Sequence, residues 1–454
     1  MPVVDVADII ENQKFSRFFV GLVAISWIVT FFDGLDANLI SFAASYFRQD
    51  YHLTTAQTGN IFALHQVGTL VGGFLFAYFA DLWGRRPTVI LATAAFGVLT
   101  MCFYFAKSYW TLSALRLLDG LPLGGMLPLA WALNIEYAPK RYRSTIVTLI
   151  MMGYSLGTAA GGPLANWLVP KFGWRSLFIS GGAAALFGAT VLFAVLPESV
   201  RFLTSKGAAS ARIAAILRRV APNQRLPQNA AFIVSDELER KQEFRPSLLF
   251  QGKLRSITPL LWIAYTASSF AVFFIINWTP LVFEVLQYSR AEANNVAALN
   301  SLLGAAGGLL LMRFVDRRGA IAIMLMPVIT FALALFVGLS NLSHDVFRVT
   351  TAAIGGFAIG GHFGMHSICG IFYPSAYRAN GAGWATSVAK IGSIAGPLVG
   401  GWVLATTLPV RHIYVVLAIC PVILGTCIFF IGRAQASILG KELLIVAPET
   451  AAMH

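Results

Sequence analysis

Two aspartates, Asp33 and Asp36, lie three residues apart inside the apolar run WIVTFFDGLDANLISF. In a helix, this spacing places both side chains on nearly the same face. An ionised carboxylate in a membrane-spanning helix costs about 2.5–3.5 kcal/mol on insertion scales, so such groups face a protein interior or a water-filled path. The pair therefore predicts a site that binds protons or cations.

Two basic residues, Arg116 and Lys390, also fall inside apolar runs. An arginine stays charged and grips a carboxylate as a fork, whereas a lysine acts as a point charge. Each is a candidate ligand for a substrate carboxylate, and Arg116 is also a candidate charge partner for Asp33 and Asp36. The alternatives are structural: Arg116 could pair with Asp119 on the same helix face, and Lys390 could form an ion pair or extend to the membrane surface.

Two histidines and two tryptophans complete the candidate substrate site. His362 and His366 are four residues apart, so they share a helix face and could bind a substrate or titrate during transport. Their alternative role is that of buried core histidines. No third ligand has suitable spacing, so neither a metal site nor a cofactor is predicted. Trp278 and Trp384 could stack on a flat ring, although packing is the commoner role for any single aromatic residue.

The elements that carry these residues are long apolar segments. Of the 454 residues, 57% are hydrophobic and only 12% are charged. Because about 20 apolar residues span the hydrocarbon, the pattern predicts an all-α integral membrane protein. The twelve predicted transmembrane helices are roughly 17–40, 59–80, 87–106, 110–137, 144–168, 175–196, 258–283, 293–314, 320–340, 347–372, 380–403 and 411–432.

A polar stretch divides these segments into two sets of six. The sequence therefore predicts an N-terminal bundle (1–196), a cytoplasmic linker with short helices (197–257) and a C-terminal bundle with a tail (258–454). Several motifs recur at an offset of 235 residues, among them Asp81 with Asp316, Pro139 with Pro374 and Arg143 with Arg378. This repetition indicates duplication, and hence two pseudo-symmetric six-helix bundles.

The charge distribution orients the chain in the membrane. The formal net charge is +13, and most of the 33 Lys and Arg residues fall in segments assigned to one side. This asymmetry follows the positive-inside rule, and it predicts that both termini are cytoplasmic. The basic balance therefore indicates topology and not a nucleic-acid partner.

The loop after the second predicted helix reads Asp-Leu-Trp-Gly-Arg-Arg, from Asp81 to Arg86. It resembles the D-x-x-G-R-[RK] loop of the major facilitator superfamily, which implies a cytoplasmic gate. We expect Asp81 near a helix N-terminus and the arginines paired with acids at other helix ends. The candidate gate residues are Asp81, Arg85, Arg86, Glu136, Asp316 and Arg317.

Further motifs resemble the aromatic acid:proton symporter family within that superfamily. They are the D-G-x-D of residues 33–36, the P-E-S-x-R-F-L of 197–203, the N-W-T-P of 277–280 and the segment from Tyr373 to Trp384. The chain departs from the family at Lys390, where Arg is common, and at His362 and His366, where Gln and Asn are common. It also departs at Asp119, where a small polar residue is expected.

The resemblance implies a proton-coupled importer of a small aromatic carboxylate that works by alternating access. Asp33 and Asp36 would carry or gate the proton, and Arg116 and Lys390 would hold the carboxylate. We expect a monomer in the lipid of a bacterial cytoplasmic membrane. The alternatives are an importer of a non-aromatic organic acid, such as a dicarboxylate or sugar acid, and with less support an exporter or a membrane sensor. An enzyme is not indicated, since the sequence has no nucleotide loop or nucleophile constellation.

Overall fold

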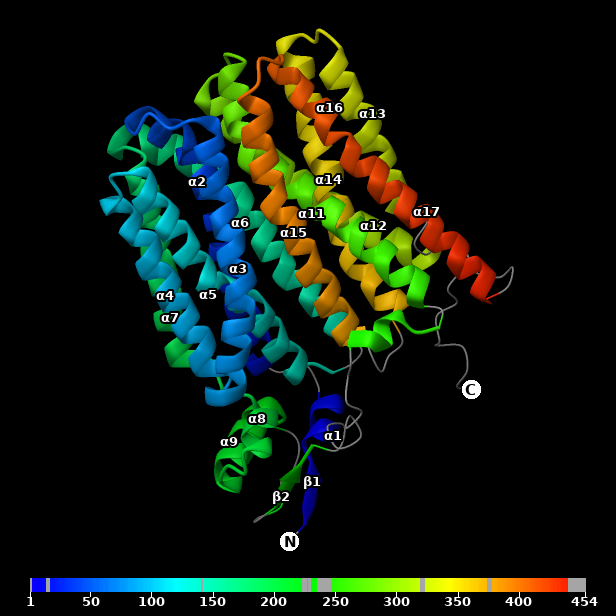
Figure 1. Ribbon diagram of the computed structural model, residues 1–454. Helices are drawn as coiled ribbons and strands as arrows, with labels where there is room; N and C mark the ends of the chain where they lie inside the picture. The colour runs from blue at the N-terminus through cyan, green and yellow to red at the C-terminus, as the bar shows by residue number, and fades with distance from the viewer. Residues whose placement is uncertain are drawn as a thin grey trace. The chain divides into compact units, whose positions relative to one another are not determined.

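The computed structural model of the chain describes residues 2–13, 17–139, 142–222, 227, 230–234, 246–252, 254–318, 323–373 and 378–439. The long helices are α2 (Arg17–Asp50), α3 (Thr55–Trp83), α4 (Arg85–Cys102), α5 (Tyr109–Tyr137), α6 (Arg143–Phe172), α7 (Arg175–Val195), α11 (Leu254–Val285), α12 (Arg290–Arg318), α13 (Leu325–Leu339), α14 (His344–Phe372), α15 (Arg378–Leu404) and α17 (Ile419–Leu439). They are labelled in Figure 1 where there is room. The shorter elements are β1 (Val3–Asp5), α1 (Val6–Glu11), η1 (Phe103–Phe105), α8 (Val200–Ser205), α9 (Ser210–Val220), β2 (Ala231–Ile233), η3 (Pro246–Phe250), η5 (Val410–His412) and α16 (Ile413–Leu417).

The all-α membrane fold predicted from the apolar runs is confirmed, because helices occupy the described part of each predicted span. Among the described residues, eight helices are both long enough and apolar enough to cross a membrane. Several helices run beyond the predicted limits: α2 has 34 residues, which correspond to about 50 Å of helix. The hydrocarbon is only about 30 Å thick, so the polar ends of such helices extend past it.

Contacts between Cα atoms divide the chain into two compact units. Unit 1 comprises Met1–Leu39, Val67–Thr158 and Leu168–Glu243. Unit 2 comprises Ile40–Gln66, Ala159–Trp167 and Phe244–His454. The sequence predicted each bundle as one continuous stretch of chain on either side of the linker 197–257, and these domain boundaries stay a prediction.

Glycines bring helices into close contact in both units, and one of these contacts recurs at equivalent positions. In unit 1, a Cβ atom at Gly157 of α6 would lie 1.9 Å from the carbonyl oxygen of Phe31 in α2. In unit 2, a Cβ atom at Gly392 of α15 would lie 2.0 Å from the carbonyl oxygen of Thr266 in α11. Only glycine permits these approaches. Both residues of the second contact lie 235 positions after those of the first, so the repeat seen in the motifs is also a repeat in helix packing.

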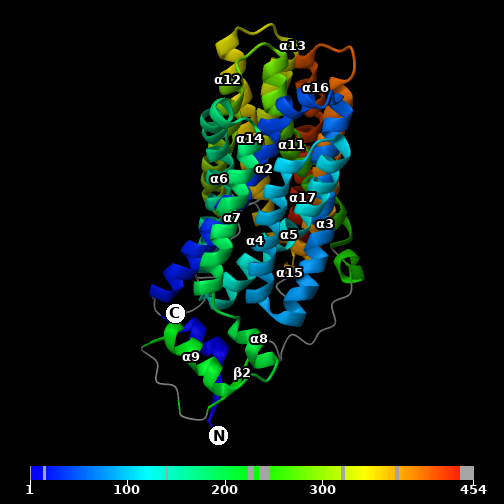
Figure 2. The same cartoon turned by 90° about the vertical axis from the view of Figure 1, so that its left-hand side faces the viewer.

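Unit 1 also contains a small assembly outside its long helices. Strand β1 pairs with β2 in parallel, with Val3 opposite Ala231 and Asp5 opposite Ile233. Apolar residues of α1 and α9, such as Ile10 and Leu217, are buried in the same cluster. Figure 2 shows α8, α9 and β2 gathered near the N-terminus, at one end of the long helices of this unit. The sequence predicted short helices in the linker but not this strand pair.

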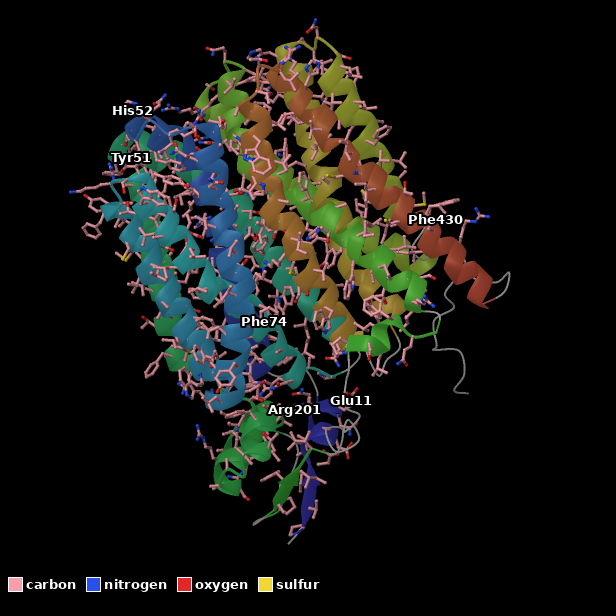
Figure 3. The ribbon with its side chains drawn as sticks, viewed as in Figure 1. Glu11, Tyr51, His52, Phe74, Arg201 and Phe430 are labelled. Atoms are coloured by element: carbon pink, nitrogen blue, oxygen red, sulfur yellow. The ribbon has the colours of Figure 1, made fainter. Side chains whose placement is uncertain are left out.

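Exposed aromatic side chains mark the surfaces that would meet lipid. Phe74 on α3 of unit 1 and Phe430 on α17 of unit 2 are both exposed (Figure 3). Large exposed apolar side chains on spanning helices are expected where the solvent is hydrocarbon. The exposed aromatics therefore agree with a membrane location for both units.

Candidate functional site

The two aspartates of α2 are both buried in unit 1. Asp33 is 5% exposed and Asp36 is 2% exposed. Between them lies Gly34, where a Cβ atom would come 2.0 Å from the carbonyl oxygen of Tyr154 in α6. The glycine lets α6 approach the turn of α2 that carries the two carboxylates, so the residue that permits the packing lies inside the candidate site.

Arg116 lies between two carboxylates from different helices. Its Nη1 atom is 2.9 Å from Oδ2 of Asp119 on the same helix, α5, and 3.7 Å from Oδ2 of Asp36 on α2. Arg116 is 2% exposed and Asp119 is fully buried. The guanidinium carbon also lies 6.0 Å from the ring centre of Phe103. The structure thus brings Asp36 and Arg116 together and adds Asp119, whose role the sequence left open.

This cluster contains more negative than positive charge. Asp36, Asp119 and Arg116 together carry one excess negative charge when all three are ionised, and Asp33 adds another. Unpaired charges are costly inside a protein that lies within a membrane. Binding a proton removes one of these charges, so the chemistry that the cluster supports is reversible proton binding.

His362, a candidate substrate residue of unit 2, has both a polar and an aromatic neighbour. Nδ1 of the half-buried His362 on α14 lies 3.0 Å from Oγ of Ser268 on α11, in a hydrogen bond whose donor depends on the histidine tautomer. The ring of Tyr265 lies 5.3 Å from the His362 ring. The sequence reasoning missed Ser268 and Tyr265. Only the pairing of α11 with α14 in space would have identified them.

Lys390 and Trp384 both lie on α15 in unit 2. Lys390 is half-buried, and Trp384 is exposed and stacks on Trp262 of α11, with ring centres 6.2 Å apart. Trp278 is 1% exposed, and its indole N–H donates to the carbonyl oxygen of Pro397 over 3.1 Å. Trp278 therefore lies within packing contacts, whereas Trp384 presents exposed ring surface.

The gate loop is held by acids of unit 1. Nε of Arg85 lies 2.7 Å from Oε1 of Glu136, and that carboxylate also accepts a hydrogen bond from Ser199. Arg86 donates to the carbonyl oxygen of Phe193 over 2.7 Å. The expected pairing of Arg85 with Glu136 is thus present in the structure.

A different acid occupies the helix N-terminus where Asp81 was expected. Asp81 lies exposed at the end of α3. Oε1 of Glu198 accepts hydrogen bonds from the backbone N–H groups of Arg85 and Arg86, at 3.0 and 3.2 Å. These groups begin α4, so Glu198 satisfies their free donors and complements the helix dipole. The P-E-S motif contained this signal, but the sequence did not say which helix the glutamate would reach.

Three candidate residues lie outside the side chains that the structure describes. They are His366 on α14 and Asp316 and Arg317 on α12. Within the described part of the chain, no group of three or more His, Cys, Asp or Glu residues is arranged to hold a metal ion.

Comparisons with known proteins agree with this architecture. The family model of the Major Facilitator Superfamily matches residues 26–365 and 261–443. The chain is 28% identical to the gallate transporter of Pseudomonas putida, over 95% of this chain and 96% of that protein. It is 30% identical to the 4-hydroxybenzoate transporter of Pseudomonas aeruginosa, over 89% of each. Among solved structures, the partially occluded inward-open xylose transporter of E. coli resembles it in fold, with a TM-score of 0.70, 16% identity, and coverage of 91% of this chain and 98% of that chain.

Proposed function

The chain belongs to the Major Facilitator Superfamily, as a multi-pass transporter and not an enzyme, and from this premise we propose that it imports a small aromatic carboxylate together with protons. Its relatives are named for gallate and 4-hydroxybenzoate, two hydroxylated benzoates, which supports that substrate class. The observation that carries the proposal is the pair of buried carboxylates, Asp36 and Asp119, that face Arg116, with Asp33 buried on the same helix as Asp36. A membrane protein keeps such groups where charge must move.

We assign proton binding to unit 1. Asp33 and Asp36 bind and release the proton, and Arg116 is the positive charge that faces Asp36. Protonation changes the charge of the cluster and so changes which conformation of the transporter is favoured. The proton and the substrate are thereby coupled through the conformational equilibrium of alternating access.

We assign the substrate anion to residues of unit 2. Lys390 provides the positive charge for the carboxylate, and His362, positioned by Ser268, provides a hydrogen-bonding group. The exposed face of Trp384 is suited to stacking on an aromatic ring. The transmembrane potential drives import when more than one proton accompanies each monovalent anion.

We place the transporter in a bacterial cytoplasmic membrane, as a monomer with cytoplasmic termini. The arginine–acid contacts around Arg85 in unit 1 then lie on the cytoplasmic side, where they gate the path. His366, Asp316 and Arg317 complete the substrate site and the second gate loop in this proposal.

Uptake by reconstituted vesicles tests the function. Purified protein in sealed liposomes should accumulate labelled 4-hydroxybenzoate or gallate when the outside is acidic, and a protonophore should abolish the accumulation. Protein-free vesicles are the essential control, because neutral benzoic acids cross bilayers unaided. Competition by benzoates but not by aliphatic dicarboxylates is the expected pattern. The reverse pattern of competition would assign the transporter to non-aromatic acids, and uptake equal to that of protein-free vesicles would contradict the proposal.

A further inference from the structure

The two aspartates that face Arg116 are not equivalent. Asp119 is within hydrogen-bond distance of the guanidinium, at 2.9 Å, and Asp36 is beyond it, at 3.7 Å. The same nitrogen, Nη1, faces both carboxylates. Among the described residues, neither oxygen of Asp36 has a hydrogen-bond partner. Asp119 is therefore the closer partner of Arg116, and Asp36 is the carboxylate with the weaker compensation.

Helix geometry fixes this asymmetry. Arg116 and Asp119 are three residues apart on α5, so one helix holds both members of the pair on one face. Asp36 comes from α2, whose distance from α5 depends on how the helices pack. A rearrangement of α2 can change the contact between Asp36 and Arg116, while the contact within α5 is preserved.

We propose that Asp119 is a positioning residue that holds Arg116 out of hydrogen-bond contact with Asp36, so that Arg116 acts on Asp36 as a fixed counter-charge and belongs to the proton site and not to the substrate site. This inference deepens the proposed function and rests on it. When Asp36 binds a proton, Arg116 stays engaged with Asp119 and does not become free to bind an anion. The substrate carboxylate then depends on the cation of unit 2, Lys390.

The charged groups close to Asp36 determine the pH at which it binds a proton. The acids are Asp33 and Asp36 from α2 and Asp119 from α5, and the cation is Arg116. Tyr154 from α6 interacts electrostatically with Asp33 and Asp36. Phe103 covers the guanidinium from η1 without adding a charge. Asp36 and Asp119 therefore outnumber the one guanidinium that both face, and Asp119 is the closer of the two.

Removing Asp119 should redirect Arg116 to Asp36. In an Asp119→Asn variant, Asp36 becomes the nearest ionised partner of that arginine, so its charged form is better compensated and it binds a proton only at lower pH. A neighbouring opposite charge within about 4–6 Å moves such a titration by one to three pH units. We expect a movement of about one unit, because Asp36 already feels part of this charge.

A substrate-free measurement tests the inference separately from the proposed function. The Tm of the full-length protein is measured against pH with Asp36 present and with Asp36→Asn, each with and without Asp119→Asn. The Tm of the protein with Asp36 is compared, at each pH, with the Tm of the Asp36→Asn variant. The difference between the two Tm values has a step at the pH where Asp36 binds its proton. Asp119→Asn should move this step to lower pH. Ser113→Ala, a buried and uncharged change on the same helix, should leave it in place.

Three results would overturn the inference. They are a step that Asp119→Asn leaves unmoved, a step that it moves to higher pH, and no step in the protein with an intact Asp119. If Asp119→Asn does not fold, the neutral pair Arg116→Gln with Asp119→Asn removes both charges, and the step should then move to higher pH. In the same double variant, the affinity for the transported aromatic acid should stay within about twofold of wild type, and a tenfold loss would return Arg116 to the substrate site.

Discussion

The contact between α2 and α6 in unit 1 and the contact between α11 and α15 in unit 2 share a backbone arrangement but differ in their polar side chains. Gly157 meets the carbonyl of Phe31 in the first, and Gly392 meets the carbonyl of Thr266 at the equivalent positions in the second. Asp33 of unit 1, however, corresponds to Ser268 in unit 2 at the same offset of 235 residues. The packing of the duplicated unit was retained while its polar side chains diverged.

The basic residues Lys390 and His362 differ in the opposite sense, because they lie in unit 2 and uncharged residues stand at the equivalent positions of unit 1. Lys390 of unit 2 corresponds to Ser155 of unit 1, and His362 corresponds to Leu127. Unit 1 therefore carries the buried acids, and unit 2 carries a lysine and a histidine suited to an anion. In the proposed symport, each copy of the duplicated scaffold binds one of the two ligands.

The largest expected effect comes from removing an acid of unit 1. Asp33→Asn should reduce proton-driven uptake to the level of protein-free vesicles, because the amide cannot carry a proton through the cycle. Uptake of labelled 4-hydroxybenzoate under an inward proton gradient is the measurement. Asp345→Asn, a change at an exposed position of α14, is the matched control. Undiminished accumulation in Asp33→Asn would remove the proton role from unit 1.

Because the two helix contacts are equivalent, we expect overpacking to cause equal losses of stability in unit 1 and in unit 2. Gly157→Ala and Gly392→Ala each place a methyl group about 2 Å from a carbonyl oxygen, so the helices must separate. Overpacking of this kind costs roughly 1–3 kcal/mol. Thermal unfolding should show a similar loss of Tm for both variants. Gly21→Ala on α2 and Gly425→Ala on α17 have no atom within 4 Å of the new Cβ and should be nearly neutral. If only one of the two variants loses Tm, the two helix contacts are not equivalent.

The anion site of unit 2 predicts a change in affinity without a change in proton dependence. Lys390→Gln should raise the KM for the aromatic acid about tenfold, which corresponds to about 1.4 kcal/mol for one lost charge contact. The pH dependence of uptake should stay as in wild type. An unchanged KM together with a shifted pH profile would transfer Lys390 to the proton site.

The smallest expected effect comes from Ser268, the residue of unit 2 at the position equivalent to Asp33. Ser268→Ala removes the hydrogen bond to His362 and should cost about 1 kcal/mol of stability. We expect a KM increase of no more than a few fold, measured beside His362→Gln. If Ser268→Ala alone abolishes transport, Ser268 acts directly on the substrate or the proton and not only through His362.

The sequence predicted the helices well because membrane spans are long and apolar, and it predicted the shared face of Asp33 and Asp36 because helical spacing is local. It also allowed the pairing of Arg116 with Asp119, three residues apart. The sequence did not predict contacts between segments that lie far apart along the chain. The spacing of residues along α5 does not say whether α2 brings Asp36 to the same guanidinium.

The same limit explains the remaining differences. The capping of α4 by Glu198, in place of Asp81, depends on where the chain returns after α7. The support of His362 by Ser268 depends on α11 packing against α14. The pairing of β1 with β2 joins segments more than two hundred residues apart. In each case the residue types were visible in the sequence, and the tertiary neighbour was not.

Counterflow in the Asp36→Asn variant separates binding of the proton by unit 1 from binding of the substrate by unit 2. Vesicles loaded with unlabelled 4-hydroxybenzoate are diluted into labelled substrate without a proton gradient, beside an assay of gradient-driven accumulation. We expect that exchange persists while accumulation is lost, because the substrate residues are intact and the proton carrier is missing. Loss of both activities in a folded variant, or retention of both, would contradict the division of roles.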